Sequence, residues 1–352
     1  MAEAQPQFKW KVGDIGKTPN ERRELFREFV LGLQDDICKT LGELDGEKEF
    51  IIDEWTKEDG SGKGKTRVIQ DGKVFESGGC NWSELRKANL PPSILKKHPH
   101  LEGQEFYATG VSMVIHPRNP HCPTVHLNYR YFEAGKLDST DVEQNNVWWF
   151  GGGMDLTPWI LYDDDAKLFH QKIKDACSEA SMPEVFEPLK RYADEYFRNK
   201  HRNESRGIGG LFYDYLNGDS NNLLYMGEDV EMKKREAGLG TFMPSKNWGE
   251  LFAFSKAQGA AFLPAYVEII NRRKDIVATD EDRDWQLHRR GRYVEFNLIH
   301  DRGTLFGLQV GGRVESILMS LPALVKWSYM YKPKNDQQKR LIEVLEKPIN
   351  WI

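Results

Sequence analysis

The stretch EFYATGVSMVIHPRNPHCPTVHLNYRYFE, residues 105 to 133, decides the fold of this chain. Two runs within it, 106 to 116 and 124 to 133, are rich in aromatic and β-branched residues, which favour strands. The loop PRNPHCP between them is too rich in proline to continue either run. The sequence therefore predicts two long neighbouring strands that the loop joins.

One face of this predicted pair of strands is polar. Because side chains alternate along a strand, the second strand carries His126, Asn128 and Arg130 on one face and apolar residues on the other. The apolar faces of both strands must pack on the same side of the sheet, and this requirement places Ser112 and His116 on the polar face too. The polar face is either the floor of a binding site or a solvated sheet surface with a satisfied histidine.

The rest of the chain adds strands and then blocks of helix. Further strands are predicted at 50 to 55, on both sides of the Asp71-Gly72 turn, at 148 to 150 and, as a β-hairpin, at 292 to 310. Helices are predicted from the Thr18 capping box onward, at 166 to 177, at 185 to 200, at 248 to 274 with a kink or break at Pro264, and from 314 to Pro322. Hairpin-connected strands beside separate helical blocks are typical of an α+β fold. No linker divides the sequence, so we expect a single domain over residues 1 to 352.

Composition narrows the class of protein. The chain is 39% hydrophobic with a net charge of -5, which is typical of a globular protein and does not favour nucleic acid as a partner. Its four cysteines form no CxxC pair, a pattern that fits a reducing compartment. The N-terminus lacks a secretory or organelle signal, and no run of eighteen apolar residues could span a membrane. We therefore expect a cytoplasmic protein without integral membrane association.

Two glycine-rich segments could be mistaken for nucleotide sites. GSGKGKT at 60 to 66 fails the phosphate-loop pattern, because Asp59 stands where the first glycine is required. FGGGMDLTP at 150 to 158 follows a predicted strand. Consecutive glycines there indicate that the backbone closely approaches another part of the chain or a ligand. From the residues alone, a structural turn and a ligand-binding loop are equally good interpretations of this segment.

Charged residues concentrate between 288 and 313. The cluster consists of His288, Arg289, Arg290, Arg292, Arg302 and Arg313. Arginine forks often bind carboxylates or phosphates in bidentate fashion, which suits a polyanionic ligand. Ion pairs with Glu295, Asp301 and Glu315 are the competing interpretation.

Histidines are numerous but show no metal-binding motif. The chain has nine, without an HExxH pair or a compact cluster, so the sequence does not favour a structural metal. Histidines that are distant in the sequence could nevertheless come together in the fold and bind a metal. The candidate set is His116, His126, His170 and His201.

Five long segments together resemble the oxygen-dependent coproporphyrinogen oxidases, in the order found in that family and along nearly the whole chain. They are EFYATGVSMVIHPRNPHCPTVHLNYRYFE, WWFGGGMDLTP, KHRNESRGIGGLFYD, RRGRYVEFNL and DRGTLFGLQVGGRVESILMSLP. The resemblance implies a homodimer whose subunit is a large, flat antiparallel sheet with helices on both faces and the substrate between sheet and helices. It also implies an activity in haem and porphyrin synthesis. Two propionates of coproporphyrinogen III are oxidatively decarboxylated to vinyls, giving protoporphyrinogen IX with dioxygen as the oxidant and no cofactor.

The resemblance also assigns roles to single residues. His126 matches the proton-donating histidine, and Asp155 matches an aspartate that holds the pyrrole NH groups. The matches to substrate contacts are Ser112, Asn128, Tyr129, Arg130, Gly311, Gly312 and Arg313, and Arg302 adds a further cation. Bacterial relatives carry a divalent-metal set that corresponds to the four histidines named above. The sequence departs from the family at 212 to 215, where FYDY replaces FFDD, and at 218 to 247, which is longer than in the bacterial pattern.

The expected chemistry follows from the substrate. A porphyrinogen has pyrrole NH donors at its centre and carboxylates at its rim, so binding needs a buried acceptor and peripheral cations. Asp155 is the expected acceptor, which helps deprotonate a pyrrole before the ring reacts with dioxygen. A non-catalytic tetrapyrrole carrier is the rival class, and it would need the arginines but neither His126 nor Asp155. A metal-dependent hydrolase that uses the four histidines is a weaker alternative.

Overall fold

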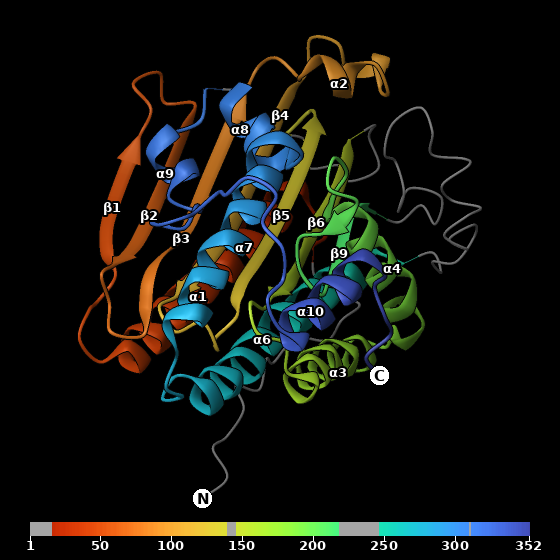
Figure 1. The fold of residues 1–352 in the computed structure, drawn as a ribbon. Coiled ribbons are helices and arrows are strands. Elements are labelled where there is room, and N and C mark those ends of the chain that lie inside the picture. Colours follow the sequence, from red (N-terminus) through yellow and green to blue (C-terminus); the bar gives the residue numbers. More distant parts are fainter. Residues whose placement is uncertain (1–15, 139–145, 218–245, 310) are drawn as a thin grey trace, which may run out of the picture.

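The computed structural model describes residues 16–138, 146–217, 246–309 and 311–352. One antiparallel sheet of seven strands, in the order β1-β2-β3-β4-β5-β6-β9, forms its centre (Figure 1). The strands are β1 (Ile51–Thr56), β2 (Gly62–Gln70), β3 (Phe75–Lys87), β4 (Glu105–Pro117), β5 (Thr124–Gly135), β6 (Val147–Thr157) and β9 (Gly210–Leu216). A small second sheet pairs β7 (Arg198–Asn199) with β8 (Glu204–Ser205). The predicted α+β class is confirmed.

The register across the sheet confirms the predicted polar face. Ser112 lies opposite Asn128, and Val114 opposite His126, so the two strands place these side chains on the same face. One row of paired residues crosses five strands on this face: Asp53, Thr66, Asn81, Ser112 and Asn128. We call this side of the sheet the polar face.

Helices cover both faces of the sheet, as expected (Figure 1). The other face is apolar and packs against α1 (Pro19–Asp45) and α6 (Trp248–Arg273), for example through Phe26 on Tyr131. The polar face packs against α4 (Phe186–Tyr196), α7 (Asp280–Ile299) and α9 (Val314–Leu318). The remaining helices are α2 (Pro92–Leu95), η1 (Pro99–Leu101), α3 (Asp163–Glu179), η2 (Pro183–Val185), α8 (Arg302–Gln309) and α10 (Asp336–Glu346).

Local signals in the sequence fix several element ends. Thr18 is the N-cap of α1 and accepts a hydrogen bond from the backbone NH of Glu21, with Pro19 in the first turn. The turn at Asp71-Gly72 joins β2 to β3, closed by the bond from the Gly72 NH to the Phe75 carbonyl. Both features were predicted from the sequence.

The expected β-hairpin at 292 to 310 is wrong, because residues 292 to 299 belong to α7 and residues 302 to 309 form α8. A complete capping box of Thr279 and Asp282 begins α7, and its buried residues recur at helical spacing, such as Gln286, Arg290 and Tyr293. The charged residues of RYVEFN, Arg292 and Glu295, are partly exposed and form an ion pair one helical turn apart.

Two helix boundaries also differ from expectation. Pro264 lies inside the single helix α6 and does not end it. Helix α9 ends at Leu318, several residues before Pro322. The unusual segment 218 to 247 lies almost wholly outside the described residues, except for Lys246 and the α6 N-cap Asn247.

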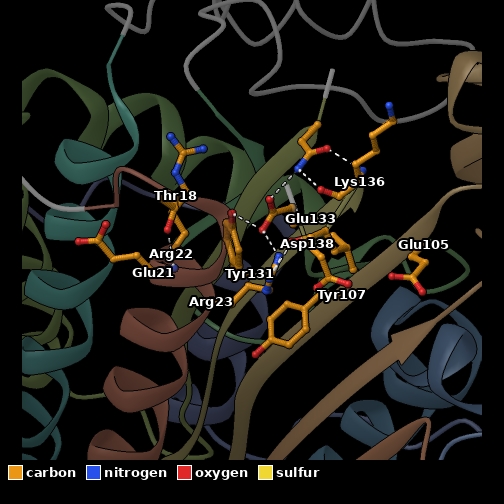
Figure 2. Close-up of polar contacts among 12 residues, drawn as sticks. Thr18, Glu21, Arg22, Arg23, Glu105, Tyr107, Tyr131, Glu133, Lys136 and Asp138 are labelled. Atoms are coloured by element: carbon orange, nitrogen blue, oxygen red, sulfur yellow. Dashed lines mark hydrogen bonds and ion pairs between the residues drawn. The ribbon is translucent and has the colours of Figure 1, made fainter. Parts of the chain in front are cut away.

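A buried ion pair fastens the first helix to the apolar face (Figure 2). Arg23 of α1 lies 3.5 Å from a carboxylate oxygen of Glu133 on β5 and donates to the Leu137 carbonyl at 2.8 Å. Glu133 is fully buried and also accepts from the Tyr131 hydroxyl and the Asn146 amide. Burial raises the pKa of Glu133, and the nearby charge of Arg23 only partly opposes this shift.

No helix in the described ranges is long and apolar enough to cross a membrane.

Candidate active site

A histidine and an aspartate meet on the polar face. His126 on β5 and Asp155 on β6 are paired in register, so their side chains leave the sheet on the same side. The Nδ1 of His126 is 2.7 Å from a carboxylate oxygen of Asp155. The His126 side chain is 15% exposed, whereas that of Asp155 is 1% exposed, so the imidazole covers the carboxylate.

A buried arginine completes this pair. Arg206 follows β8 and donates from Nη2 to both carboxylate oxygens of Asp155, at 3.0 and 2.8 Å. Its Nη1 donates to the Oδ1 of Asn297 on α7 at 2.8 Å. Three aromatic rings surround the guanidinium, with centroids 4.3 to 4.9 Å away, from Phe197, Tyr293 and Phe296. We call His126, Asp155 and Arg206 the buried triad.

The electrostatics of the triad keep Asp155 ionised. Burial raises the pKa of Asp155, but the charge of Arg206 and the hydrogen bond from His126 outweigh it and hold that pKa below its usual value. The carboxylate is therefore ionised at neutral pH, and the Nδ1 of His126 donates to it. The other ring nitrogen of His126, Nε2, lies 3.4 Å from the Asn128 amide nitrogen. A carboxylate that fixes one histidine tautomer in this way orients the other ring nitrogen for proton transfer.

Arg130 lies farther along β5 in a channel that glycines create. Its register partners on the two neighbouring strands are Gly110 and Gly151. A Cβ on Gly151 would come within 2.5 Å of the Arg130 Nε, and one on Gly110 within 2.9 Å of its Cβ. The glycine run 151 to 153 therefore makes room at Gly151 for this arginine. Arg130 donates to Asn128 at 3.2 Å and forms a 3.0 Å ion pair with Asp214 on β9.

Two predicted substrate contacts differ in their positions. Ser112 is exposed on the polar face, beside Asn128 in the register. Tyr129 is fully buried on the opposite face, where its ring packs against Phe29 of α1. The Tyr129 side chain therefore points away from the polar face, as the alternation along β5 predicts.

The C-terminal binding segment lies mainly over the other edge of the sheet. Arg313 pairs with Asp53 on β1, and the Gly311 carbonyl accepts from Lys57 at 3.2 Å. Four strand spacings of about 4.8 Å put β1 about 19 Å from β5, so Arg313 and Gly312 are remote from the triad. Arg302, at the start of α8, instead lies over the ring of Tyr196, 5.3 Å from its centroid.

The arginine cluster at 288 to 313 is largely structural. Arg289 pairs with Glu204, Arg290 with Glu76, and Arg292 with Glu295, and all three arginines are on α7. The interpretation as ion pairs is thus correct for these three, although two of the partners come from distant segments.

The structure does not bring the four candidate metal ligands together. His116 bonds to Thr124 and to the Ser320 carbonyl, and burial lowers its pKa to about 3. His170 bonds to the Ala166 carbonyl, and His201 bonds to Glu295 and His300. In the part of the chain that the structure describes, no group of three or more His, Cys, Asp or Glu residues is placed to hold a metal.

Sequence reasoning missed two polar residues of the site. Arg206 lies in the quoted block KHRNESRGIGGLFYD, and Asp214 was noted only as part of a departure from the family pattern. The one available signal was a charge shortly before strand β9, at Arg206, and a second charge within that strand, at Asp214. Their partners, Asp155 and Arg130, could not be identified without the register of that strand.

A model of the coproporphyrinogen III oxidase family matches residues 25–351. The chain belongs to this family. Three similar relatives are each named oxygen-dependent coproporphyrinogen-III oxidase. They come from Synechococcus sp. strain CC9605 (49% identity, 95% of this chain and 89% of the relative), Prochlorococcus marinus strain MIT 9313 (48%, 96% and 93%) and strain NATL1A (49%, 94% and 92%).

The coproporphyrinogen III oxidase match covers every element of the site. It includes the strands that carry Ser112, His126 and Asp155, the turn that carries Arg206, and the C-terminal segment with Arg302 and Arg313. The family resemblance stated from five sequence blocks is thereby confirmed over nearly the whole chain.

Proposed function

We propose that this chain oxidatively decarboxylates two propionates of coproporphyrinogen III to vinyls and so forms protoporphyrinogen IX. The observation that carries the proposal is the buried triad, in which Arg206 holds Asp155 and Asp155 holds the partly exposed His126 on the polar face. Membership of the coproporphyrinogen III oxidase family supports the same reaction.

The reaction balances with dioxygen alone. Each propionate loses carbon dioxide, one proton and two electrons when it becomes a vinyl group, and dioxygen takes up two electrons and two protons to give hydrogen peroxide. The net consumption is one dioxygen and one proton per vinyl. Because the substrate supplies both electrons, the reaction needs no bound redox cofactor.

In the proposed mechanism His126 contacts the substrate and Asp155 acts through it. Both carboxylate oxygens of Asp155 are occupied by His126 and Arg206, so a pyrrole NH reaches the exposed imidazole first. The Nε2 of His126, which lies beside the Asn128 amide, then accepts a pyrrole proton. The activated ring reacts with dioxygen, and the resulting peroxide removes a propionate β-hydrogen as carbon dioxide leaves. This modifies the role expected from the sequence, in which Asp155 binds the pyrroles directly.

Cations on the polar face would hold the carboxylate rim of the substrate. We assign this role to Arg130 and Arg302, with Asn128 and Ser112 as neutral contacts between them and the triad. Gly311, Gly312 and Arg313 form a second group over β1, where Arg313 must exchange Asp53 for a substrate carboxylate.

A tetrapyrrole carrier is the rival function, and the buried triad argues against it. A carrier needs rim cations, but it has no use for a histidine held in one tautomer by a buried carboxylate. We further propose a cytoplasmic homodimer, on the family resemblance alone.

Product analysis tests the proposed reaction. Enzyme treated with EDTA should convert coproporphyrinogen III to protoporphyrinogen IX in air and form no product under nitrogen. His126→Gln should abolish turnover, whereas His100→Gln, at an exposed histidine, should not change it. Activity that chelation removes and that only iron or copper restores would contradict the cofactor-free reaction. Full activity of His126→Gln would contradict the role of the triad.

A further inference from the structure

Helix α7 presents one of its faces to the buried triad. Phe296 and Asn297 follow Tyr293 by three and four residues, so the three side chains lie on the same face of the helix. The guanidinium carbon of Arg206 is 4.8 Å from the ring centroid of Tyr293 and 4.9 Å from that of Phe296. The Oδ1 of Asn297 accepts from the Nη1 of Arg206 at 2.8 Å. Helix α7 therefore supplies both an apolar surround and a polar anchor for this arginine.

Arg206 contacts Asp155 in a way that leaves its orientation to other groups. Both hydrogen bonds to the carboxylate come from one nitrogen, Nη2, whereas an arginine fork usually uses two nitrogens. The Nε of Arg206 has no hydrogen-bond partner among the described residues, so it gives no second anchor there. The face of an aromatic ring attracts a cation without selecting one of its NH groups. The bond from Nη1 to Asn297 is thus the contact that fixes how the guanidinium is turned.

The orientation of Arg206 decides what Asp155 can offer to His126. One carboxylate oxygen, Oδ1, accepts from the His126 Nδ1 at 2.7 Å and from the Arg206 Nη2 at 3.0 Å. A rotation that brought a second guanidinium nitrogen onto the carboxylate would place another donor at this oxygen, where Nη2 is already 3.5 Å from Nδ1. Asn297 opposes such a rotation, because it holds Nη1 on the side of α7.

We propose that Asn297 is a positioning residue, which orients Arg206 so that Asp155 keeps one oxygen for His126. The inference rests on the proposed function and extends it to a residue to which the family resemblance assigned no role. Asn297 is 4% exposed and bonds to the guanidinium nitrogen that does not contact Asp155, so it acts through Arg206 and not on the substrate.

Kinetics of Asn297 variants test this proposal. Initial rates in air would be measured against coproporphyrinogen concentration, at a temperature below the onset of unfolding of every variant. Asn297→Leu keeps a similar volume without the acceptor, so kcat should fall about tenfold while KM stays within about twofold of the wild type. Asn297→Asp keeps an acceptor oxygen at the same position and should restore most of kcat.

Gln286 provides a matched control on the same helix. It is a buried amide whose oxygen also accepts from an arginine, Arg283, but this arginine pairs with Glu76. Gln286→Leu should therefore lower the melting temperature and leave kcat unchanged. An unchanged kcat in Asn297→Leu, or an equal fall of kcat in Gln286→Leu, would overturn the proposal.

A double-mutant cycle separates positioning from a general effect on the fold. Arg206→Lys keeps the positive charge but has no planar guanidinium for Asn297 to orient. Adding Asn297→Leu to Arg206→Lys should therefore lower kcat no further, whereas an additional tenfold loss, about the effect in the wild type, would show that Asn297 acts independently of Arg206. If Asn297→Leu does not fold, Asn297→Ala, which also lacks the acceptor, takes its place. A wild type without turnover would instead contradict the proposed function itself.

Discussion

At Asp155 a single buried carboxylate has two charged or polar neighbours and almost no contact with solvent. Its exposed fraction is 1%, and that of Arg206 is 4%. A buried ion pair of this kind is costly to break, because the partner that remains is a charge without compensation. The chemistry of the site and the stability of the fold are therefore coupled at this residue.

Asp155→Asn should lower both stability and turnover. The amide loses the negative charge that Arg206 and His126 require, and a buried charge left unpaired costs about 3 to 5 kcal/mol of unfolding free energy. Turnover of the folded enzyme should fall at least a hundredfold, roughly 2.7 kcal/mol of transition-state stabilisation, while KM changes little. Melting temperature and kcat, measured on the same preparation, check both effects.

A double variant separates the two effects. Asp155→Asn combined with Arg206→Met removes both charges and places an apolar side chain among Phe197, Tyr293 and Phe296, so much of the melting temperature should return. Turnover should stay low, because His126 still lacks its carboxylate. Recovery of kcat to within tenfold of the wild type would show that Asp155 matters only for folding.

Residue-scale predictions succeeded where alternation along a strand was enough. The shared face of Ser112, Asn128 and His126 followed from the sequence alone, because the apolar residues of both strands had to pack together. The Arg206 contact could not be predicted in this way, since it depends on a turn that returns to β6 from a distant segment. Alternation also placed the Tyr129 side chain on the apolar face, where it is buried.

At the scale of elements, helix α1 depends on a buried glutamate whose ionisation opposes folding. The pKa of Glu133 is raised in the folded chain. A group with a raised folded pKa contributes stability that is fully present below its unfolded pKa and is lost as pH rises through the folded pKa. Ionisation of Glu133 therefore lowers the free energy of unfolding as the pH rises from about 4.5 through the raised value.

Glu133→Gln should remove this pH dependence. The amide keeps acceptor and donor groups for Tyr131 and Asn146 without a buried charge. As the pH rises from 4.5 to 7, the melting temperature of Glu133→Gln should increase relative to that of the wild type. The exposed control Glu102→Gln should show no such trend. If the melting temperature of the wild type instead increases relative to that of the variant over this range, the ion pair with Arg23 stabilises ionised Glu133 by more than burial destabilises it.

Elements were predictable where two signals agreed. The Thr18 cap with its apolar spacing gave α1, and the strands around 105 to 133 gave the centre of the sheet. The region from 292 to 310 had only an alternating pattern, and the signals that identify the helix, the Thr279 capping box and the buried Arg289 and Arg290 paired with Glu204 and Glu76, lie upstream of it. A hydrophobic pattern cannot identify core positions that are filled by ion pairs.

At the scale of the whole molecule, one face of a seven-stranded sheet carries the groups to which we assign roles in the proposed reaction. The triad lies near one edge, rim cations lie beside it on β5 and α8, and Arg313 lies over the opposite edge. The separation of these groups suits a wide macrocycle with charges at its rim better than it suits a small substrate.

The stoichiometry of gas exchange tests the proposed reaction most directly. Purified, chelated enzyme would be mixed with coproporphyrinogen III while dioxygen uptake, carbon dioxide release and protoporphyrinogen IX are measured together. A reaction in which the substrate is the only reductant should consume two dioxygen and release two carbon dioxide per product. Product formed without dioxygen uptake, or only after a reductant is added, would contradict it.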